Sequence, residues 1–563
     1  MTSDRRERIA EAGGVGGRGG SAERGESSKR GMAAMGEVSG IQSPVSFRRL
    51  TKYIHHVVLG PMMIVVLLSL LSNCEQNDPG KSDGPFAKAK YRIKQLMKKK
   101  NIASFQVAVA RDGEMVLEEA FGTANVEQQI RTTPRTMHLV ASIAKPFTST
   151  ALMILAERGT IDLKGPINRY LRDSRLIAFQ GDASDATVAR MMLHTSGLPY
   201  GYYICGDEIP QGDRRTGREI LDLSGVLICP PGTRYQYTNI GYGLLEDLVR
   251  DVTGVDMKRF VQDEIIIPLN LENTGFFRLH APPEKTATQN LDNGALPIAY
   301  DADGYTALYS TAGDLVRFGM FHMKAHLPGQ KAILADSSLD MLWKYAEPGV
   351  EGTTRRLAWD VQQDYGFETV QHGGGGPGIH NWLYMIPSEK VVIAIMSNAR
   401  YSNQGSNPVL KELIRASISK QASHRFRPGA GRGYAGQTLL NPVAFSGMWN
   451  GSIRGPKGSC PVAIHIDGKG RPKMRIDGDP CSTGQWIAPS VKVNKGHRCL
   501  LWRFDACIPY LYPQAVHDEV IITLWPEGRK LAGSASAAKE KNFGKGENYV
   551  LPQYVELTRT GDL

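Results

Sequence analysis

Ser142 and Lys145 stand three residues apart in the stretch SIAK, at the start of an apolar-periodic segment. Positions i and i+3 of a helix lie on the same face, so the serine hydroxyl and the lysine amine fall within hydrogen-bond reach. A serine beside a base is the arrangement of an activated nucleophile for acyl transfer. The same spacing recurs at 417–420 and 536–539, where we expect structural or surface serines, so the pair needs supporting context.

The residues after Ser142 predict the helix that positions it. Pro146 is tolerated in a helical first turn, and Gly159 suits the end of a helix. Ser142 then lies at the positive end of the helix dipole, which favours developing negative charge. An apolar stripe faces the core, made of Phe147, Ala151, Ile154 and Leu155.

Two later segments add polar groups in order along the chain. Tyr237 and Asn239 lie in a loop just before a helical pattern that places Tyr242, Leu245, Val249 and Val252 on one face. His372 then opens a glycine run, 373–376, followed by two strand-like segments.

The ordered set Ser-x-x-Lys, Tyr-x-Asn and His-Gly-Gly resembles the class C β-lactamase-related serine hydrolases. That family includes penicillin-binding proteins, D-alanyl-D-alanine carboxypeptidases, D-aminopeptidases and esterases. The resemblance covers about residues 88–420, and His-Gly-Gly resembles the family's Lys-Thr-Gly element. Three auxiliary segments agree with it, Leu193–Pro199, Pro231–Thr233 and Tyr309–Phe318.

The resemblance implies a role for each catalytic residue. Ser142 is the expected nucleophile, and Lys145 accepts its proton or tunes its pKa. Tyr237 is expected to act with Lys145 as general base and then to protonate the leaving group. A phenol titrates near pH ~10, so we expect a neighbouring ammonium to be needed to make its anion accessible.

The resemblance also implies the substrate-binding groups. Asn239 is expected to orient Lys145 or the substrate amide, and the backbone N–H groups of Ser142 and Gly375 to form the oxyanion hole. Gly373 and Gly374 let a substrate lie close to the strand.

His372 departs from the lysine of many true β-lactamases. Histidine is largely neutral at pH 7, so it attracts a substrate carboxylate less than lysine does. We therefore expect an exported amide or ester hydrolase, of peptidase or esterase type, acting on a small-molecule or peptide substrate. The alternative is a penicillin-recognising or peptidoglycan-binding module with slow or no turnover.

Other chemistries find little support in the sequence. There is no Gly-x-Ser-x-Gly elbow, no phosphate-binding Gly-x-x-x-x-Gly-Lys-Ser/Thr loop and no His-Glu-x-x-His helix. The expected reaction needs no metal and no cofactor. We expect His194 to shape a loop, and His380 and Trp382 to serve core packing rather than chemistry.

The N-terminal segments predict export. Residues 1–56 have the composition of a disordered leader, with Met32 and Met35 as alternative starts. Residues 57–74 follow a basic stretch and resemble a bacterial lipoprotein signal in which Cys74 is lipidated; the alternatives are an uncleaved anchor or a standard signal. Residues 75–87 are a polar tether. The resemblance implies membrane tethering in the cell envelope or periplasm.

Six cysteines besides Cys74 are compatible with disulfides in an oxidising compartment. Cys205 and Cys229 form the expected pair if each domain pairs internally, four C-terminal cysteines allow three pairings, and reduced buried thiols are the alternative. The formal net charge of +11 is not concentrated in a basic stripe, so we expect no nucleic-acid partner. The sequence leaves the oligomeric state open.

The element pattern predicts an α+β hydrolase domain over 88–423, an antiparallel sheet flanked by helices with a helical lobe at 142–370. Helices are expected at 87–99, 311–321 and 408–419, and strands at 105–110, 115–121, 382–386 and 391–397. The turns at Asp112-Gly113 and 387–390 indicate hairpins.

A linker at 424–437 leads to an all-β domain over 438–563, expected to be a lipocalin-like barrel. We expect it to have a structural or site-covering role; the alternative is a barrel that carries a lipophilic ligand. Its expected strands lie at 445–453, 463–466, 473–476, 499–504, 520–525 and 554–558.

Overall fold

The structure is a computed structural model of the 563-residue chain. The leader, the signal segment with Cys74 and most of the two linkers fall outside the residues it describes. No helix in the described part is long and apolar enough to cross a membrane. The structure describes residues 84–173, 175–206, 217–276, 285–288, 290–291, 294–295, 298–300, 307–350, 353–376, 378–399, 403–427, 440–478, 484–491, 499–508, 519–539 and 547–560.

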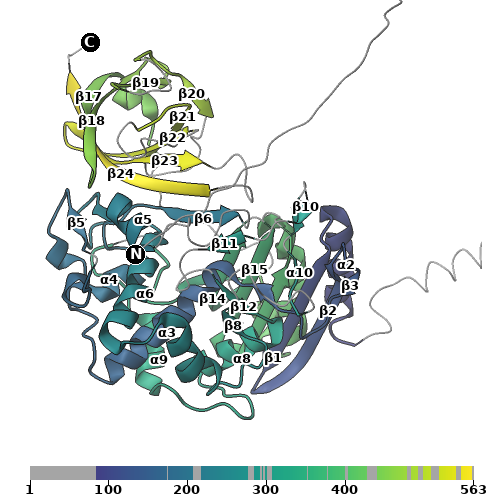
Figure 1. Cartoon of the computed structure of the whole chain (residues 1–563). Helices are drawn as coiled ribbons and strands as arrows, with labels where there is room; N and C mark the ends of the chain where they lie inside the picture. The colour runs from purple at the N-terminus through teal and green to yellow at the C-terminus, as the bar shows by residue number, and fades with distance from the viewer. Residues whose placement is uncertain are drawn as a thin grey trace, which may run out of the picture. The chain divides into compact units, whose positions relative to one another are not determined.

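A seven-stranded sheet forms the centre of the catalytic domain (Figure 1). All of its neighbouring strands run antiparallel, which confirms the predicted sheet. The predicted hairpin at residues 112–113 joins strands Ser104–Arg111 and Glu114–Asn125, with positive φ at Asp112 and Gly113, as a two-residue turn requires. In spatial order the strands are β13 (Asp360–Asp364), β14 (Phe367–Gly376), β15 (Ile379–Ile386), β16 (Val391–Ser397), β1 (Ser104–Arg111), β2 (Glu114–Asn125) and β3 (Ile130–Arg131).

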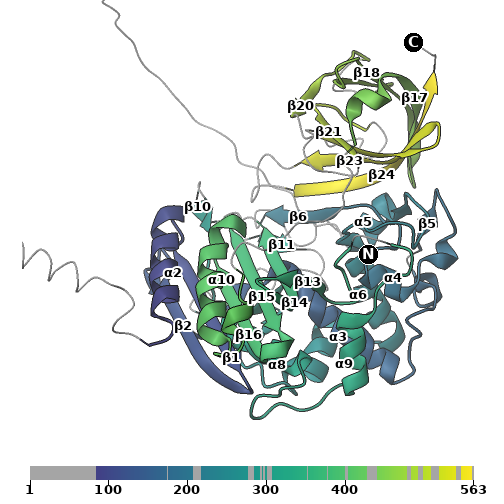
Figure 2. The same cartoon turned by 180° about the vertical axis from the view of Figure 1, so that it is seen from behind.

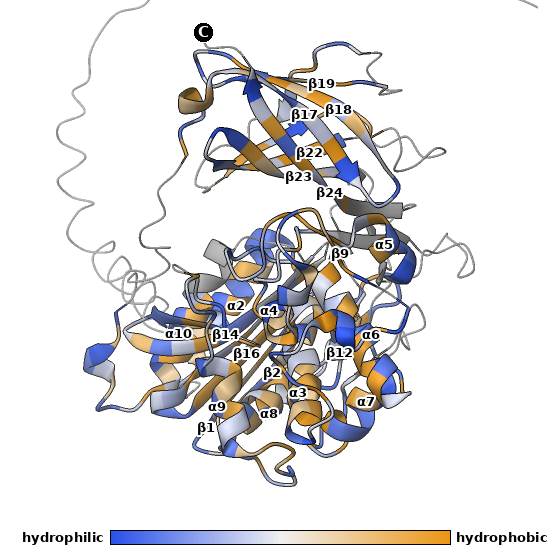
Figure 3. Ribbon diagram, turned by 90° about the vertical axis from the view of Figure 1, so that its left-hand side faces the viewer, coloured by the Kyte–Doolittle hydropathy of each residue, from blue (hydrophilic) through white to orange (hydrophobic). Residues whose placement is uncertain are grey.

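Helices cover both faces of this sheet (Figures 1 and 2). Helices α2 (Ala87–Lys100) and α10 (Asn403–Ser417) pack with β1, β15 and β16 in one apolar cluster. Helix α8 (Ala312–His322) packs against β1, β15 and β16 in a second cluster, and orange residues follow α8 and β16 in Figure 3. Helix α10 begins five residues earlier than predicted and contains Pro408.

Helix α8 begins at the predicted Thr311, whose side chain accepts the backbone N–H of Asp314 at 3.2 Å. The Asp314 carboxylate accepts from Asn273 N–H and Thr274 Oγ1.

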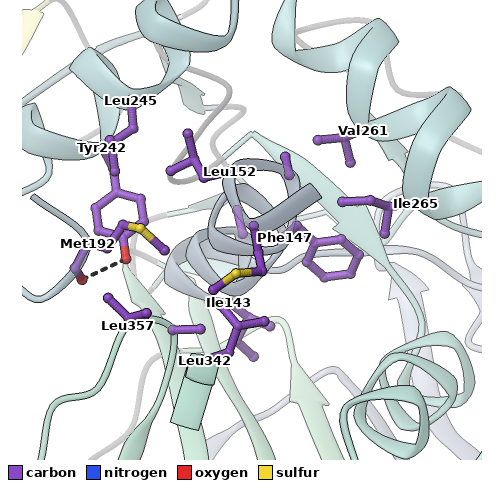
Figure 4. Packing of buried hydrophobic residues seen from close by; sticks show 14 of the residues in the cluster. Ile143, Phe147, Leu152, Met192, Tyr242, Leu245, Val261, Ile265, Leu342 and Leu357 are labelled. Atoms are coloured by element: carbon purple, nitrogen blue, oxygen red, sulfur yellow. Dashed lines mark hydrogen bonds between the residues drawn. The ribbon is translucent and has the colours of Figure 1, made fainter. Parts of the chain in front are cut away.

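The helical lobe is built around α3 (Ala144–Glu157), which is almost wholly buried. Ile143 and Phe147 point into the same apolar cluster as Tyr242, whose hydroxyl donates to the Met192 carbonyl at 3.0 Å (Figure 4). The other lobe helices are α4 (Val188–Met192), α5 (Gly217–Ser224), α6 (Ile240–Thr253), α7 (Met257–Val261) continuing into a π-helical turn (Gln262–Ile266), and α9 (Asp336–Lys344).

Short strands complete this domain. Strand β12 (Leu308–Ser310) pairs with β4 (His138–Leu139) and β8 (Gly275–Phe276), and β5 (Ile177–Ala178) pairs in parallel with β7 (Val226–Leu227). Two further pairs join β9 (Asn290–Leu291) to β10 (Gly294–Ala295) and β6 (Tyr202–Gly206) to β11 (Ile298–Tyr300).

The C-terminal domain is an antiparallel barrel, as predicted. Consecutive strands pair with one another except β19 and β20, which lie at the two ends of the strand order. β17 also pairs with β24, and an isolated bridge between Met474 and Ile487 brings the two ends together. Apolar side chains fill its interior, among them Trp502, Phe504 and Leu524. The strands are β17 (Gly447–Gly455), β18 (Gly458–Ile466), β19 (Pro472–Ile476), β20 (Pro489–Val491), β21 (Leu500–Phe504), β22 (Glu519–Glu527), β23 (Lys530–Lys539) and β24 (Glu547–Thr560).

Strands β20 and β23 were not among the sequence-based expectations. Strand β23 reads KLAGSASAAK, with no β-branched or aromatic residue, so it lacks the composition typical of strands. Its small inward side chains leave room for the larger residues of the other strands.

The barrel contacts the helical lobe through backbone and side chains. Strand β24 pairs with β6, and Gln553 donates to the Leu223 carbonyl at 2.6 Å. Arg234 forms a 2.8 Å ion pair with Glu527 and lies 4.7 Å from the ring centre of Trp525. Contacts with the barrel therefore hold the loop that precedes Tyr237.

The structure contradicts the expected Cys205–Cys229 disulfide, because Cys229 is a free, fully buried thiol. Burial raises the pKa of this thiol. Cys499 is also a free thiol, whereas Cys507 is disulfide-bonded. The side chain of Cys205 lies outside the described residues.

Candidate active site

Ser142 lies in a 3₁₀ turn, Ala141–Ile143, directly before helix α3. Ala141 has a φ of +51°, a left-handed conformation that a residue with a Cβ rarely adopts. Strain of this kind persists only where the surrounding fold enforces it. The backbone thus turns sharply at the serine and presents it at the N-terminal end of α3.

Two side chains converge on the Ser142 hydroxyl, and a third holds the lysine. Tyr237 Oη lies 2.8 Å from Ser142 Oγ, and Lys145 Nζ lies 3.3 Å from the same oxygen. Lys145 also donates to Asn239 Oδ1 at 2.8 Å. Asn239 is the residue that precedes helix α6, so the α6 terminus and the first turn of α3 together fix the lysine amine. The structure therefore brings together four residues that the sequence analysis selected.

Burial sets the protonation of Lys145 and Tyr237. The pKa of Lys145 is lowered well below its usual 10.5, first by burial and then by the charge of Arg355. Burial also raises the pKa of Tyr237 above its usual value, an effect that the Ser142 hydrogen bond only partly opposes. These shifts favour the neutral amine of Lys145 and the neutral phenol of Tyr237, whereas the sequence analysis expected a tyrosinate held by an ammonium.

His194 supports the loop that carries Tyr237. Its Nδ1 accepts the Thr238 N–H at 3.1 Å, its carbonyl accepts the Gln236 N–H at 2.8 Å, and its ring centre lies 4.3 Å from that of Tyr237. Burial lowers the pKa of His194 well below 6.5, so the ring is neutral with its proton on Nε2. This geometry agrees with the loop-shaping role expected for His194.

Strand β14 approaches the serine turn through its glycine run. A Cβ at Gly374 would lie 2.0 Å from the Val140 carbonyl oxygen, so only glycine allows this close approach. Gly375 is exposed beyond that contact, with open space where a Cβ would stand. Strand β14 thus passes beside the turn that carries Ser142.

His372 is buried on β14 and donates from Nδ1 to the Gly373 carbonyl at 2.8 Å, which leaves Nε2 as an acceptor. Burial, followed by the charges of Arg355 and Lys145, lowers its pKa well below 6.5. His372 is therefore neutral and does not replace the lysine cation of the Lys-Thr-Gly element.

The sequence profile of the Beta-lactamase family matches residues 90–415, more than half of the chain. The chain belongs to the Beta-lactamase family. Its homologues are serine hydrolases with the same fold.

A curated relative of this family member is unguisins hydrolase ungD' of Aspergillus campestris. The two are 24% identical over 358 residues, which cover 59% of this chain and 66% of the relative. The chain thus spans slightly less than two thirds of that relative's length.

Two solved structures share the fold. SurE has a TM-score of 0.54 at 18% identity, and the octameric penicillin-binding protein homologue from Pyrococcus abyssi has 0.50 at 19% identity. Each match covers 84% of this chain and 99% of the other. The shared fold therefore extends beyond the catalytic domain.

The structure adds one residue to the site of this family member that the sequence analysis missed. Arg355, in the loop before β13, is 4% exposed, and its guanidinium carbon lies 5.9 Å from the ring centre of Tyr237. No local pattern in the sequence distinguishes it from its half-buried neighbour Arg356.

Several other candidates lie apart from the reaction centre. Ser417 donates to the Leu413 carbonyl inside α10, and Ser536 lies on strand β23, where residues three apart face opposite sides. His380 is buried on β15, as expected for core packing. Among the residues that the structure describes, no group of three or more His, Cys, Asp or Glu side chains could hold a metal ion.

Proposed function

We propose that this chain cleaves an amide or ester through an acyl-enzyme on Ser142. The observation that carries the proposal is the convergence of Tyr237 Oη and Lys145 Nζ on one serine oxygen, at 2.8 and 3.3 Å. A hydroxyl with a neutral amine on one side and a phenol donor on the other can lose its proton and attack a carbonyl.

In the acylation step the Ser142 oxygen forms a bond to the substrate carbonyl carbon while its proton passes to neutral Lys145. The backbone N–H groups of Ser142 and Gly375 stabilise the oxyanion. Tyr237 protonates the leaving group as the scissile bond breaks, and the Lys145 proton then returns to Tyr237. A water molecule reverses these transfers to release the acid and restore Ser142.

The neutral His372 supports a peptidase or esterase rather than an efficient β-lactamase. A permanent cation on that strand could hold the carboxylate of a β-lactam, and a neutral imidazole with a free Nε2 acceptor does so poorly. A substrate class of D-amino-acid peptides or small esters remains our expectation. The name of the unguisins hydrolase supports a hydrolytic activity.

The test uses the full chain with a fluorophosphonate and a fluorescent penicillin. We expect a fluorophosphonate adduct on Ser142 by peptide mapping, absent in Ser142→Ala, and steady turnover of p-nitrophenyl acetate. A burst of acylation without turnover would instead favour a penicillin-recognising module. The absence of any adduct on folded protein would refute the acyl-enzyme.

We also propose that the chain is exported and tethered through Cys74. The basic and apolar sequence of residues 48–74 supports this, and so does the disulfide-bonded Cys507, since disulfides persist in oxidising compartments. Labelling of expressing bacteria with an alkyne fatty acid should mark the chain but not a Cys74→Ala variant. Equal labelling of both would refute lipidation at Cys74.

A further inference from the structure

Helix α2 is strongly basic. Its 14 residues, AKAKYRIKQLMKKK, contain six lysines, one arginine and no acidic residue. Ala89, Ile93 and Leu96 are buried in the apolar cluster under the helix, so the cations occupy the remaining surface. Six of them are exposed, namely Lys88, Arg92, Lys94, Lys98, Lys99 and Lys100. These charges thus gather on one outward face, contrary to the sequence-based expectation of no basic stripe.

The elements next to this face add little negative charge. Lys90 pairs with Glu119 of strand β2. Helix α10 lies beside α2 in the same layer (Figure 2), and its described part adds Lys411 and Arg415 against one carboxylate, Glu412. Like charges one helical turn apart destabilise a helix, so an anionic partner would offset a cost that the surface carries by itself.

An aromatic side chain lies in the middle of the basic face. Tyr91 is 43% exposed. Lys88 and Lys94 are three residues from Tyr91 and Lys98 is seven residues from it, so all three lie on the same side of the helix. Tyrosine is enriched where a membrane meets water, because its ring suits the headgroup level while its hydroxyl stays hydrated. A tyrosine flanked by lysines therefore fits the headgroup region of an anionic membrane.

The place of α2 in the chain also favours a membrane. Residues 75–83 alone separate Cys74, the proposed lipidation site, from Gly84, the first described residue. Ten backbone steps span at most about 35 Å. Lipidation of Cys74 would therefore keep the start of α2 within about that distance of the bilayer surface.

We propose that the exposed face of α2 binds the anionic headgroups of the membrane that anchors the chain. This rests on the proposed tethering and is independent of the acyl-enzyme. A single fatty acyl chain holds a protein only reversibly, and a basic surface beside it supplies a second attraction. Each Lys or Arg near an anionic membrane strengthens binding about fivefold.

This docking is compatible with catalysis. Helix α3, which follows Ser142, packs in the apolar cluster on the other face of the sheet from α2. Lipid bound at α2 therefore does not cover the reaction centre.

The first test measures sedimentation with vesicles. It uses the chain begun at Glu75, because the apolar signal would itself enter lipid and every contact of the described residues lies within 84–560. The vesicles are phosphatidylcholine alone, or three parts phosphatidylcholine to one part phosphatidylglycerol. We expect binding to the anionic vesicles to be at least about tenfold stronger and to weaken as salt is added. Equal binding to both vesicles would overturn the proposal.

Two variants with the same net charge locate the surface. The α2 variant removes four exposed charges and keeps a good helix former at each position: Lys88→Gln, Arg92→Gln, Lys94→Gln and Lys98→Gln. The control removes three lysines and one arginine that are exposed on other elements: Lys331→Gln, Lys457→Gln, Lys473→Gln and Arg529→Gln.

The α2 variant should lose about a hundredfold in binding to the anionic vesicles, and the control should bind like the parent chain. An equal loss in both variants would show an effect of net charge alone and would overturn the α2 surface. Both variants should hydrolyse p-nitrophenyl acetate at the parent rate, which verifies that each is folded.

A second measurement uses the full tethered chain in vesicles of the same two compositions. A membrane-impermeant succinimidyl ester acylates accessible lysines, and peptide mass mapping reports each site. We expect Lys88, Lys94 and Lys98 to react less on the anionic vesicles than on the neutral ones, whereas Lys331 and Lys473 react equally on both.

Three results separate the possible failures. Equal acylation of the α2 lysines on both vesicles would overturn the proposal. Retention of the chain begun at Glu75 by a short DNA duplex, without binding to anionic vesicles, would overturn the lipid assignment in favour of nucleic acid. Equal fatty-acid labelling of the parent chain and Cys74→Ala would refute the tether instead, so the two failures are distinct.

Discussion

The substitution Asn239→Asp tests whether Lys145 works as a neutral base. The change is isosteric and keeps an oxygen 2.8 Å from Lys145 Nζ, but it adds a negative charge there. A carboxylate at that distance favours the ammonium form and raises the pKa of Lys145. The fraction of enzyme with a free base then falls at every pH below the new pKa.

The distance sets the size of the expected effect. Two unit charges 2.8 Å apart attract by about 6 kcal/mol at an effective dielectric constant of 20, which corresponds to roughly four pKa units. Desolvation of the new carboxylate opposes part of this, so we expect the pKa of Lys145 to rise by at least about two units. At a pH below the pKa of Lys145 in both proteins, kcat/KM of the variant should be lower about tenfold for each unit by which the pKa has risen.

The assay is the pH profile of kcat/KM for a neutral ester, from pH 5 to 10. The acid limb should move to higher pH in Asn239→Asp, and activity should recover as the pH approaches the new value. The control is Asn450→Asp, which adds the same charge at an exposed position on β17. An acid limb at the original pH in folded Asn239→Asp would show that Lys145 is not the base.

Three further results are expected. Tyr237→Phe should keep the fold but lower kcat/KM by about 10²–10⁴, the range of a general acid, and a loss below threefold would remove Tyr237 from the mechanism. Gly374→Ala should lower stability by about 1–3 kcal/mol in urea unfolding and reduce activity, because its Cβ would meet the Val140 carbonyl, whereas Gly375→Ala, with open space, should match the parent protein. Burial lowers the pKa of His322 from 6.5 to about 3, so the unfolded state binds a proton that the folded state does not. Stability should therefore fall by up to about 1.4 kcal/mol per unit as the pH drops below 6.5, and His322→Gln should weaken that slope; identical slopes would contradict it.

The sequence predicted the parts of the site that depend on local spacing. Ser142 and Lys145 lie one helical turn apart. Tyr237 and Asn239 are separated by one residue in the loop just before a helix. A short sequence pattern can therefore identify each pair. The central sheet was predictable for the same reason, since its hairpins carry clear turn residues and alternating strands.

What the sequence did not predict depends on contacts between distant residues. Arg355 reaches Tyr237 across 118 positions, the difference between 355 and 237, and nothing beside it marks it as buried. Burial favours the neutral forms of Lys145 and Tyr237, and sequence spacing does not report burial. The predicted Cys205–Cys229 disulfide was wrong for a similar reason, because an even number of cysteines carries no information about where they lie in the fold.

The contact between the barrel and the helical lobe limits how this protein can change over evolution. Val226 and Ile228 of the lobe share an apolar cluster with Ala532 and Tyr554 of the barrel, and Ile220 and Leu223 join the barrel's own core. A recombination event that exchanged the barrel for an unrelated module would leave these side chains in water and the edge of β6 unpaired. The two domains are therefore expected to be inherited as one unit, with new specificities arising in loops and not by domain shuffling.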